Sequence, residues 1–122
     1  MLTESQEQIT VVDFCKLKKL TFTSIPNGFF TSKRDGKFYG QINKLKKEGY
    51  SPGFPDLMIF LPEGNLLIIE MKRAKKGVIS IDQQRWLCKL INLGFDANVC
   101  NGAEEAIKLI QSRIMLYNKV KK

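Results

Sequence analysis

The sequence predicts an α/β protein in which a central mixed β-sheet is flanked by helices on both faces. Two near-continuous apolar runs, 56–61 and 66–72, have the composition of strands whose two faces are both covered. Segments with a helical apolar period precede and follow them, so the expected order is helix, strand, helix, two strands, helix, strand and helix. The 122 residues, 43% of them hydrophobic and 26% charged, suit a single domain spanning residues 1–122.

The first helix is expected over residues 4–19. Thr3 stands at its N-cap, and Gln6 completes a capping box three residues later. Glu4 is expected at the polar end of the core-facing stripe, with Glu7 nearer the stripe's edge as the alternative acid. A first-turn carboxylate also suits the helix dipole, so a purely structural role stays open for Glu4. The other members of the stripe are Gln8, Val11 and Cys15.

A short strand over 21–25 and a second helix over 38–48 are expected next. The turn signal Pro26-Asn27-Gly28 ends the strand, and Gly49 is the expected C-cap of the helix. The polar segment 29–37 between them could approach a phosphate backbone or be an ordinary surface loop. The helix is expected to bury Phe38, Ile42 and Leu45 and to gather Lys44, Lys46 and Lys47 at its C-terminal end, where the dipole also favours them.

The two apolar runs are expected to pair as a hairpin. Pro62-Glu63-Gly64 suits a three-residue loop, because proline presets φ at the first position and glycine takes the left-handed third position. With this loop Leu61 pairs with Asn65, and counting back along both strands sets Asp56 directly opposite Glu70. The two carboxylates are therefore predicted to share one face of the sheet.

Lys72 is expected on the same face as Glu70, since side chains along a strand alternate with period two. Opposed carboxylates repel each other, and the pair becomes tolerable if a divalent cation lies between its members. Oxygen ligands and the absence of any histidine favour Mg²⁺ or Mn²⁺ over zinc. The alternative is that Asp56 begins its strand in solvent while Glu70 and Lys72 form a surface ion pair.

A third helix, a last strand and a final helix complete the chain, over roughly 81–93, 97–100 and 103–117. Ser80 and Gln83 form a second capping box at the start of the third helix, which Gly94 ends. Gln83 therefore has a structural explanation of its own. The expected buried stripes are Trp86, Leu87, Leu90 and Ile91 in the third helix, and Ile107, Ile110 and Ile114 in the last.

The net charge is +8, from 20 Lys and Arg against 12 Asp and Glu, and it indicates a polyanionic partner. Nucleic acid is the natural candidate, although such a charge can also serve solubility alone. No Walker-type loop is visible, so no nucleotide cofactor is expected. The absence of histidine excludes His-dependent nucleases, zinc hydrolases and histidine triads. The expected phosphate contacts are Lys33, Arg34, Lys44, Lys47, Arg73, Lys75 and Lys76.

No apolar run approaches the ~20 residues of a membrane span, and the polar N-terminus lacks the core of a signal peptide. We therefore expect a cytoplasmic protein with no membrane partner. Cys15, Cys88 and Cys100 are odd in number and set among apolar residues, which favours reduced thiols packed in the core.

Three motifs, Gly53-Phe-Pro-Asp56, Glu70-Met-Lys72 and Gln83, occur in one order and spacing. They resemble the signature of the virus-type replication-repair nuclease (VRR-NUC) domain, within the PD-(D/E)xK nuclease superfamily. The resemblance covers most of the chain, including the opening Glu4-Ser-Gln-x-Gln8 and Ile25-Pro-Asn-Gly28, and several ordered motifs are fairly specific. Phe29 departs from the pattern, since members often carry a second glycine there. The resemblance implies the restriction-endonuclease-like fold.

The function predicted from the residues and the resemblance is Mg²⁺- or Mn²⁺-dependent endonucleolytic cleavage of DNA. Asp56, Glu70 and the backbone carbonyl of Met71 would hold the metal. Glu4, to which the resemblance assigns the helix-one glutamate, would hold a second metal or its water shell, with one metal or two left open. Lys72 would orient the attacking water or stabilise the transition state, and the resemblance places Gln83 beside that lysine.

Compact stand-alone members of this family look like junction resolvases, which points to a homodimer that cuts branched DNA such as a four-way junction. The expected setting is a phage or prophage protein acting in the host cytosol. Two alternatives stay open: a non-catalytic nucleic-acid-binding module that keeps the fold, and a structural subunit of a phage replication or repair assembly. The weak sequence hint of a dimer surface is the apolar set Ile114, Met115, Leu116 and Val120 near the C-terminus.

Overall fold

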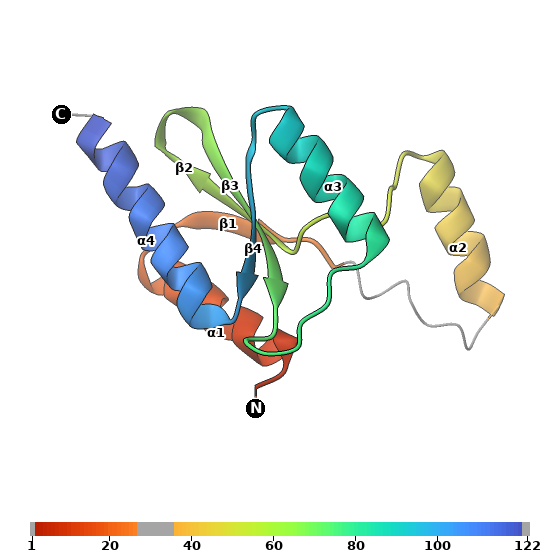
Figure 1. Ribbon diagram of the computed structural model, residues 1–122. Helices are drawn as coiled ribbons and strands as arrows, with labels where there is room; N and C mark the ends of the chain where they lie inside the picture. Colours follow the sequence, from red (N-terminus) through yellow and green to blue (C-terminus); the bar gives the residue numbers. More distant parts are fainter. Residues whose placement is uncertain (1, 27–35, 121–122) are drawn as a thin grey trace.

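A computed structural model describes the backbone over residues 2–26 and 36–120, and the side chains over 2–26 and 40–118. Its helices and strands follow the predicted order (Figure 1). The elements are α1 (Glu4–Leu17), β1 (Thr21–Ser24), α2 (Gly36–Lys47), β2 (Leu57–Leu61), the turn η2 (Pro62–Gly64), β3 (Asn65–Lys72), α3 (Ile81–Asn92), β4 (Asp96–Asn101) and α4 (Ala103–Val120). Both predicted capping boxes, at the starts of α1 and α3, are present.

The described strands form one mixed four-stranded sheet in the order β1-β2-β3-β4. β2 is antiparallel to both β1 and β3, whereas β4 runs parallel to β3. Leu61 pairs with Asn65 and Leu57 with Ile69, so the predicted hairpin register is confirmed. One residue before the start of β2, this register sets Asp56 opposite Glu70.

The turn that joins β2 to β3 differs from the expectation at one position. Glu63 takes the left-handed conformation (φ 62°, ψ 33°) together with Gly64 (φ 74°), whereas only the glycine was expected there. Both the backbone N–H and the side-chain amide of Asn65 donate to the carbonyl oxygen of Pro62, the latter over 2.8 Å. These hydrogen bonds hold the turn and fix Asn65 at the start of β3.

Helices cover both faces of the sheet, as predicted. On one face α1 and α4 enclose the larger core, whose buried side chains are Val11, Cys15, Leu57, Ile59, Leu61, Leu67, Ile69, Met71, Cys100, Ala103, Ala106 and Ile110. On the other face α3 packs over β3 and β4, through Leu87 and Leu90 against Ile68 and Ala97. Glu70 lies on this second face, because it is two residues from Ile68 along β3.

Two predictions for α3 are wrong. Ile91 is 54% exposed and Cys88 is also exposed, although both were expected in the core. The buried stripe of α3 is centred on Leu87 and Leu90, and each further residue turns about 100° around the helix. Ile91 and Cys88 therefore point away from the buried stripe and into solvent. The remaining cysteines, Cys15 and Cys100, are buried as expected.

α2 lies apart from the sheet (Figure 1). Ile42 and Leu45 are only half-buried, so the expected buried stripe of this helix is wrong at these two positions. The side chain of Phe38 lies outside the described residues. The helix ends as predicted at Gly49, whose φ of +109° suits a glycine, and the next N–H, of Tyr50, donates to the Leu45 carbonyl over 2.8 Å.

In α4 the predicted stripe is buried at Ile110, while Ile107 and Ile114 are half-buried against the same core. In the described part of the chain no helix has the length and apolar character needed to cross a membrane.

Candidate active site

Asp56 and Glu70 meet where the β2–β3 hairpin opens towards α1. Asp56 Oδ2 accepts a hydrogen bond from the Met71 backbone N–H over 2.8 Å, and the Asp56 carbonyl accepts one from Ile25 N–H over 2.9 Å. Its side chain is thereby fixed against β3 while its backbone extends the contact with β1. Glu70 is fully buried. The facing carboxylates predicted from the register are present.

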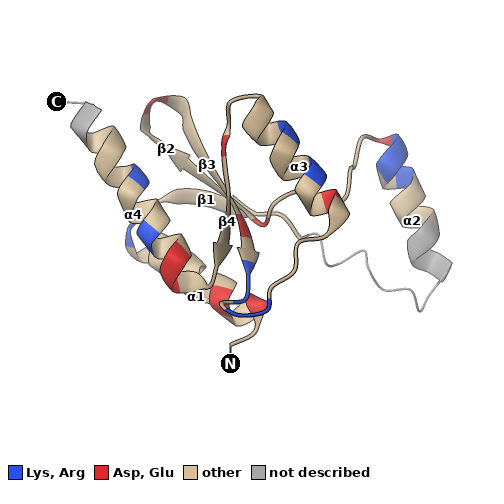
Figure 2. Cartoon of the chain, in the orientation of Figure 1, with Lys and Arg blue, Asp and Glu red and all other residues tan. Residues whose placement is uncertain are grey.

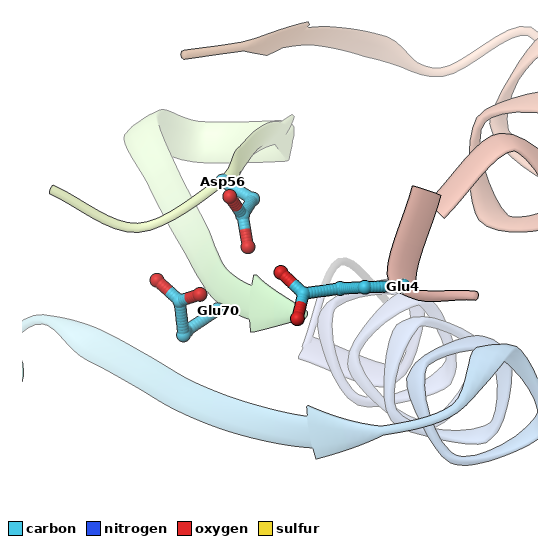
Figure 3. Close-up of side chains that lie close together, drawn as sticks. All are labelled: Glu4, Asp56 and Glu70. Carbon is cyan, nitrogen blue, oxygen red and sulfur yellow. The ribbon is translucent and has the colours of Figure 1, made fainter. Parts of the chain in front are cut away.

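Glu4 reaches the same point from the first turn of α1. One carboxylate oxygen from each of Glu4, Asp56 and Glu70 lies within 4.8 Å of the others (Figure 3). Glu4 and Asp56 are half-buried, so the cluster has one fully buried member and two that face its opening. Three carboxylates in so small a space offer hard oxygen ligands, which are the ligands that Mg²⁺ and Mn²⁺ prefer.

The surroundings of Glu70 disfavour the charged form of its carboxyl group. Burial raises the pKa of Glu70 to about 9, and the hydrogen bond and charge of Asp56 and the charge of Glu4 act in the same direction, against a lowering effect of Lys72. Glu70 Oε1 has no hydrogen-bond partner in the described structure, although it is buried. A buried, unsatisfied carboxylate oxygen facing two further carboxylates is what a bound divalent cation would satisfy. The residues therefore fit the metal that the resemblance implies.

Lys72 and Gln83 complete the polar network. Lys72 Nζ lies 3.6 Å from Glu70 Oε2 and donates to Gln83 Oε1 over 2.9 Å. Gln83 Nε2 in turn donates to Glu70 Oε2 over 3.3 Å. Gln83 Oε1 also accepts from the Ser80 backbone N–H over 2.9 Å. The side chain of Gln83 thus serves the helix cap and contacts both Lys72 and Glu70 at once, so its two predicted explanations hold together.

Glu7, the alternative to Glu4, lies elsewhere. It is buried, and its Oε1 accepts from the backbone N–H of Ala103 at the start of α4 over 3.3 Å. Glu4 is therefore the α1 acid that joins the carboxylate cluster. Glu7, expected nearer the edge of the helical stripe, is instead buried in line with Val11 and Cys15. The signal that separates the two acids is the resemblance, which assigns the helix-one glutamate to Glu4.

Two glycines near the cluster allow close backbone approach. A Cβ on Gly53 would lie 2.6 Å from the Asp82 carbonyl carbon, so the chain leading to Asp56 rests on the first turn of α3. A Cβ on Gly77 would lie 2.7 Å from Lys72 Cβ. Gly53 belongs to the first motif, whereas no sequence pattern indicated that Gly77 packs against the lysine.

The basic residues predicted to contact phosphates are placed as follows. Arg73, Lys75 and Lys76 are exposed on the turn after β3, next to the cluster, and Lys44 and Lys47 are exposed at the end of α2 (Figure 2). Lys33 and Arg34 lie outside the described residues. Two further basic residues, Arg85 and Lys89 of α3, were not singled out from the sequence. They line a surface pocket together with Ser51, Pro52, Asp82 and Trp86. Their spacing of four residues, which places both on one side of a helix, was the available signal.

A mixed sheet that carries an Asp…Glu-x-Lys set at its end, with a helix-one glutamate beside it, defines the class of protein: a nuclease domain of the PD-(D/E)xK superfamily. The sequence model of the VRR-NUC domain matches residues 3–104, and the chain therefore belongs to the VRR-NUC family.

Solved structures agree with this assignment. The chain is similar to a structure described as a "VRR_NUC domain protein", with 25% identity, a TM-score of 0.75 and coverage of 95% of this chain and 91% of the other. A second, described as a "VRR_NUC domain", has 18% identity, a TM-score of 0.62 and coverage of 90% and 97%, and it supports the fold. No curated protein matches the chain in sequence.

Proposed function

We propose that this nuclease domain is a Mg²⁺- or Mn²⁺-dependent endonuclease that hydrolyses phosphodiester bonds in DNA. One observation carries the proposal: three carboxylates from separate elements converge within 4.8 Å around a buried acid, beside a lysine held 3.6 Å from it. The carboxylates repel one another, so the cluster lowers the stability of the metal-free fold. Its presence therefore indicates a role in chemistry.

Asp56, Glu70 and Glu4 are the residues that would hold the metal, with the Met71 backbone carbonyl as a further oxygen ligand. When bound, the metal would polarise a phosphoryl oxygen and favour deprotonation of the attacking water. The N–H of Met71 holds Asp56 Oδ2, and Asp56 Oδ1 would be the oxygen offered to the metal. Glu70 offers its unsatisfied Oε1 in the same way.

Lys72 is proposed to stabilise the negative charge that develops on the phosphoryl group, or to orient the water. Its ammonium group contacts Glu70 and Gln83, so it is held in place before the substrate arrives. Pre-organised charge of this kind costs no reorganisation during the reaction and is worth about 10²–10³-fold in rate for a single donor in known enzymes. Gln83 acts through Lys72 and Glu70 and is a positioning residue.

DNA is proposed to bind across the turn 73–77, whose Arg73, Lys75 and Lys76 lie beside the cluster, and to extend towards Lys44 and Lys47 of α2. The exposed positions of these side chains suit contacts with phosphates, which fix the position of a duplex without reading its sequence. Lys33 and Arg34 are proposed to belong to the same surface on the strength of the sequence alone.

The decisive experiment compares cleavage by the wild type, Asp56→Asn and Lys72→Ala, with Lys108→Ala, which removes an exposed lysine of α4, as a matched control for loss of one lysine. Both site variants are expected to lose cleavage in Mg²⁺ or Mn²⁺ while their thermal stability and DNA binding stay close to wild type. EDTA should abolish wild-type cleavage. Undiminished metal-dependent cleavage by either variant would overturn the assignment, and DNA binding without cleavage by the wild type would favour a non-catalytic module.

The functional unit is further proposed to be a homodimer acting on branched DNA, since two cuts on a junction need two equivalent sites. Met115 and Leu116 of α4 are 60% and 50% exposed, which suits a dimer surface, whereas Ile114 packs against the core and Val120 lies outside the described side chains. Light scattering at micromolar concentration should give twice the 14.0 kDa of the chain. Cleavage of single-stranded, duplex, flap and four-way-junction DNA at equal rates would contradict the preference for branches. A phage or prophage origin and action in the host cytosol complete the proposal.

A further inference from the structure

Glu7 is the one buried charged side chain of the described structure that the proposed chemistry leaves unused. The buried charged residues there are Glu7, Glu70 and Lys72, and the latter two belong to the site. Glu7 is only 7% exposed, and no lysine or arginine of the described residues forms an ion pair with it. A buried carboxylate of this kind needs hydrogen bonds or a favourable dipole to offset its desolvation.

The carboxylate of Glu7 obtains both from the corner that joins β4 to α4. Its Oε1 accepts from the Ala103 N–H over 3.3 Å, at the positive end of an 18-residue helix. Its Oε2 would lie 2.9 Å from a Cβ on Gly102, so the corner admits the carboxylate because a glycine stands there. Gly102 N–H donates in turn to the carbonyl of Lys72 over 2.8 Å. Through the backbone of Gly102 and Ala103, Glu7 is thereby connected to Lys72 at the end of β3.

Of the described residues near the start of α1, Glu7 is the only one that is buried. The buried residues of that helix are Glu7, Val11 and Cys15, whereas Leu2, Thr3, Ser5 and Gln6 are exposed. Helix ends fray unless contacts hold them. Glu4 lies on this same first turn, three residues before Glu7, and therefore shares its face. Glu4 therefore stands on the turn that Glu7 ties to the start of α4.

We propose that Glu7 is a positioning residue for the metal site, which locks the first turn of α1 to the β4–α4 corner and so holds Glu4 in the carboxylate cluster. The inference rests on the proposed function for the part played by Glu4. It assigns no ligand role to Glu7, whose two oxygens face Ala103 and Gly102. Glu7 thus anchors the first turn of α1, and Glu4 on the same turn would bind the metal.

The test measures Mn²⁺ binding to the DNA-free protein by isothermal titration, for the wild type, Glu7→Ala and Glu7→Gln. Glu7→Ala is expected to weaken binding about 10-fold, as loss of an outer-shell partner of a metal site does. Glu7→Gln keeps an oxygen that can accept from Ala103 and should stay within about 3-fold of wild type. Asp13→Ala, which removes an exposed carboxylate from the same helix, is the matched control and should leave binding unchanged.

A double-mutant cycle with Glu4→Ala separates positioning from a general loss of stability. If Glu7 acts through Glu4, adding Glu7→Ala to Glu4→Ala should weaken Mn²⁺ binding by less than about 2-fold. An undiminished effect of Glu7→Ala in that background, or no effect in the wild-type background, would overturn the inference. The two proposals fail in different ways, because Mn²⁺ binding by Asp56→Asn at wild-type strength would refute the metal site itself.

Hydrogen exchange of the metal-free protein tests the anchor without reference to metal. The amide of Ala103 and the amides at the start of α1 should exchange about 10-fold faster in Glu7→Ala than in wild type, with the amides of β2 and β3 unchanged. Protection that is the same in both proteins would show that other contacts hold the first turn, and it would contradict the proposal whatever the metal result.

Discussion

Replacing Glu70 by glutamine should change how the stability of the metal-free protein depends on pH. Burial and the neighbouring carboxylates raise the pKa of Glu70 from 4.5 to about 9 in the fold. A group with a raised folded-state pKa contributes stability that is fully present below its unfolded pKa and is lost as the pH rises towards the folded value. The wild type should therefore lose stability from this group between about pH 4.5 and pH 9, whereas the neutral glutamine cannot contribute to such a loss.

The size of the effect follows from the shift. Each pH unit in this window costs about 1.36 kcal/mol, so the three units from pH 5 to pH 8 correspond to about 4 kcal/mol. The quantity to measure is the difference in the free energy of unfolding between Glu70→Gln and wild type, because titrations common to both proteins cancel in it. This difference should shift by about 4 kcal/mol in favour of the variant over that range.

Urea unfolding in EDTA at pH 5, 6, 7 and 8 would measure this difference. Glu104→Gln is the matched control, since the Glu104 side chain is 84% exposed and should show a nearly constant difference from wild type. Adding Mg²⁺ at pH 8 should stabilise the wild type and leave Glu70→Gln almost unchanged, because a ligand stabilises only the protein that binds it. A difference between Glu70→Gln and wild type that stays constant from pH 5 to pH 8 would refute the electrostatic reading of the site.

Three further predictions follow from single contacts. Gln83→Glu keeps the capping box but sets a third acid beside Glu70. Cleavage should therefore fall at least 10-fold with little change in melting temperature. A variant as active as wild type would contradict the role given to the Gln83 amide. Gly77→Ala places a methyl 2.7 Å from Lys72 Cβ and should lower the free energy of unfolding by about 1–3 kcal/mol. The displaced Lys72 should lower kcat more than it raises KM. The control is Gly40→Ala, whose added Cβ meets nothing within 4 Å. Lys75→Ala should make the log–log salt dependence of duplex binding shallower by about 0.9, and a flat salt response of the wild type would leave the +8 charge as a solubility device.

The hairpin and its register were predictable because they depend on local sequence alone. The loop 62–64 fixes the pairing of Leu61 with Asn65, and strand alternation then places Asp56, Glu70 and Lys72 without knowledge of the rest of the fold. Capping boxes are local in the same sense, which explains why both helix starts were predicted to the residue.

Features that depend on where elements pack were predicted less well. The apolar side chains of α2 have the helical period of a buried stripe and predicted one. Periodicity cannot reveal that a helix lies apart from the sheet. Ile91 and Cys88 are exposed because α3 covers the sheet with a narrow stripe. The contact of Gly77 with Lys72 and that of Glu7 with Ala103 join positions up to 96 residues apart, and no local pattern encodes them.

The separation of α2 from the sheet has a consequence for how this protein can diversify. Since Ile42 and Leu45 are only half-buried, substitutions along α2 should change the free energy of unfolding far less than substitutions in β2 or β3. The lysines at its end can therefore be exchanged, and the helix lengthened or shortened, while the carboxylate cluster keeps its geometry. If α2 contacts DNA as proposed, its contacts could therefore change through substitutions that leave the sheet stable.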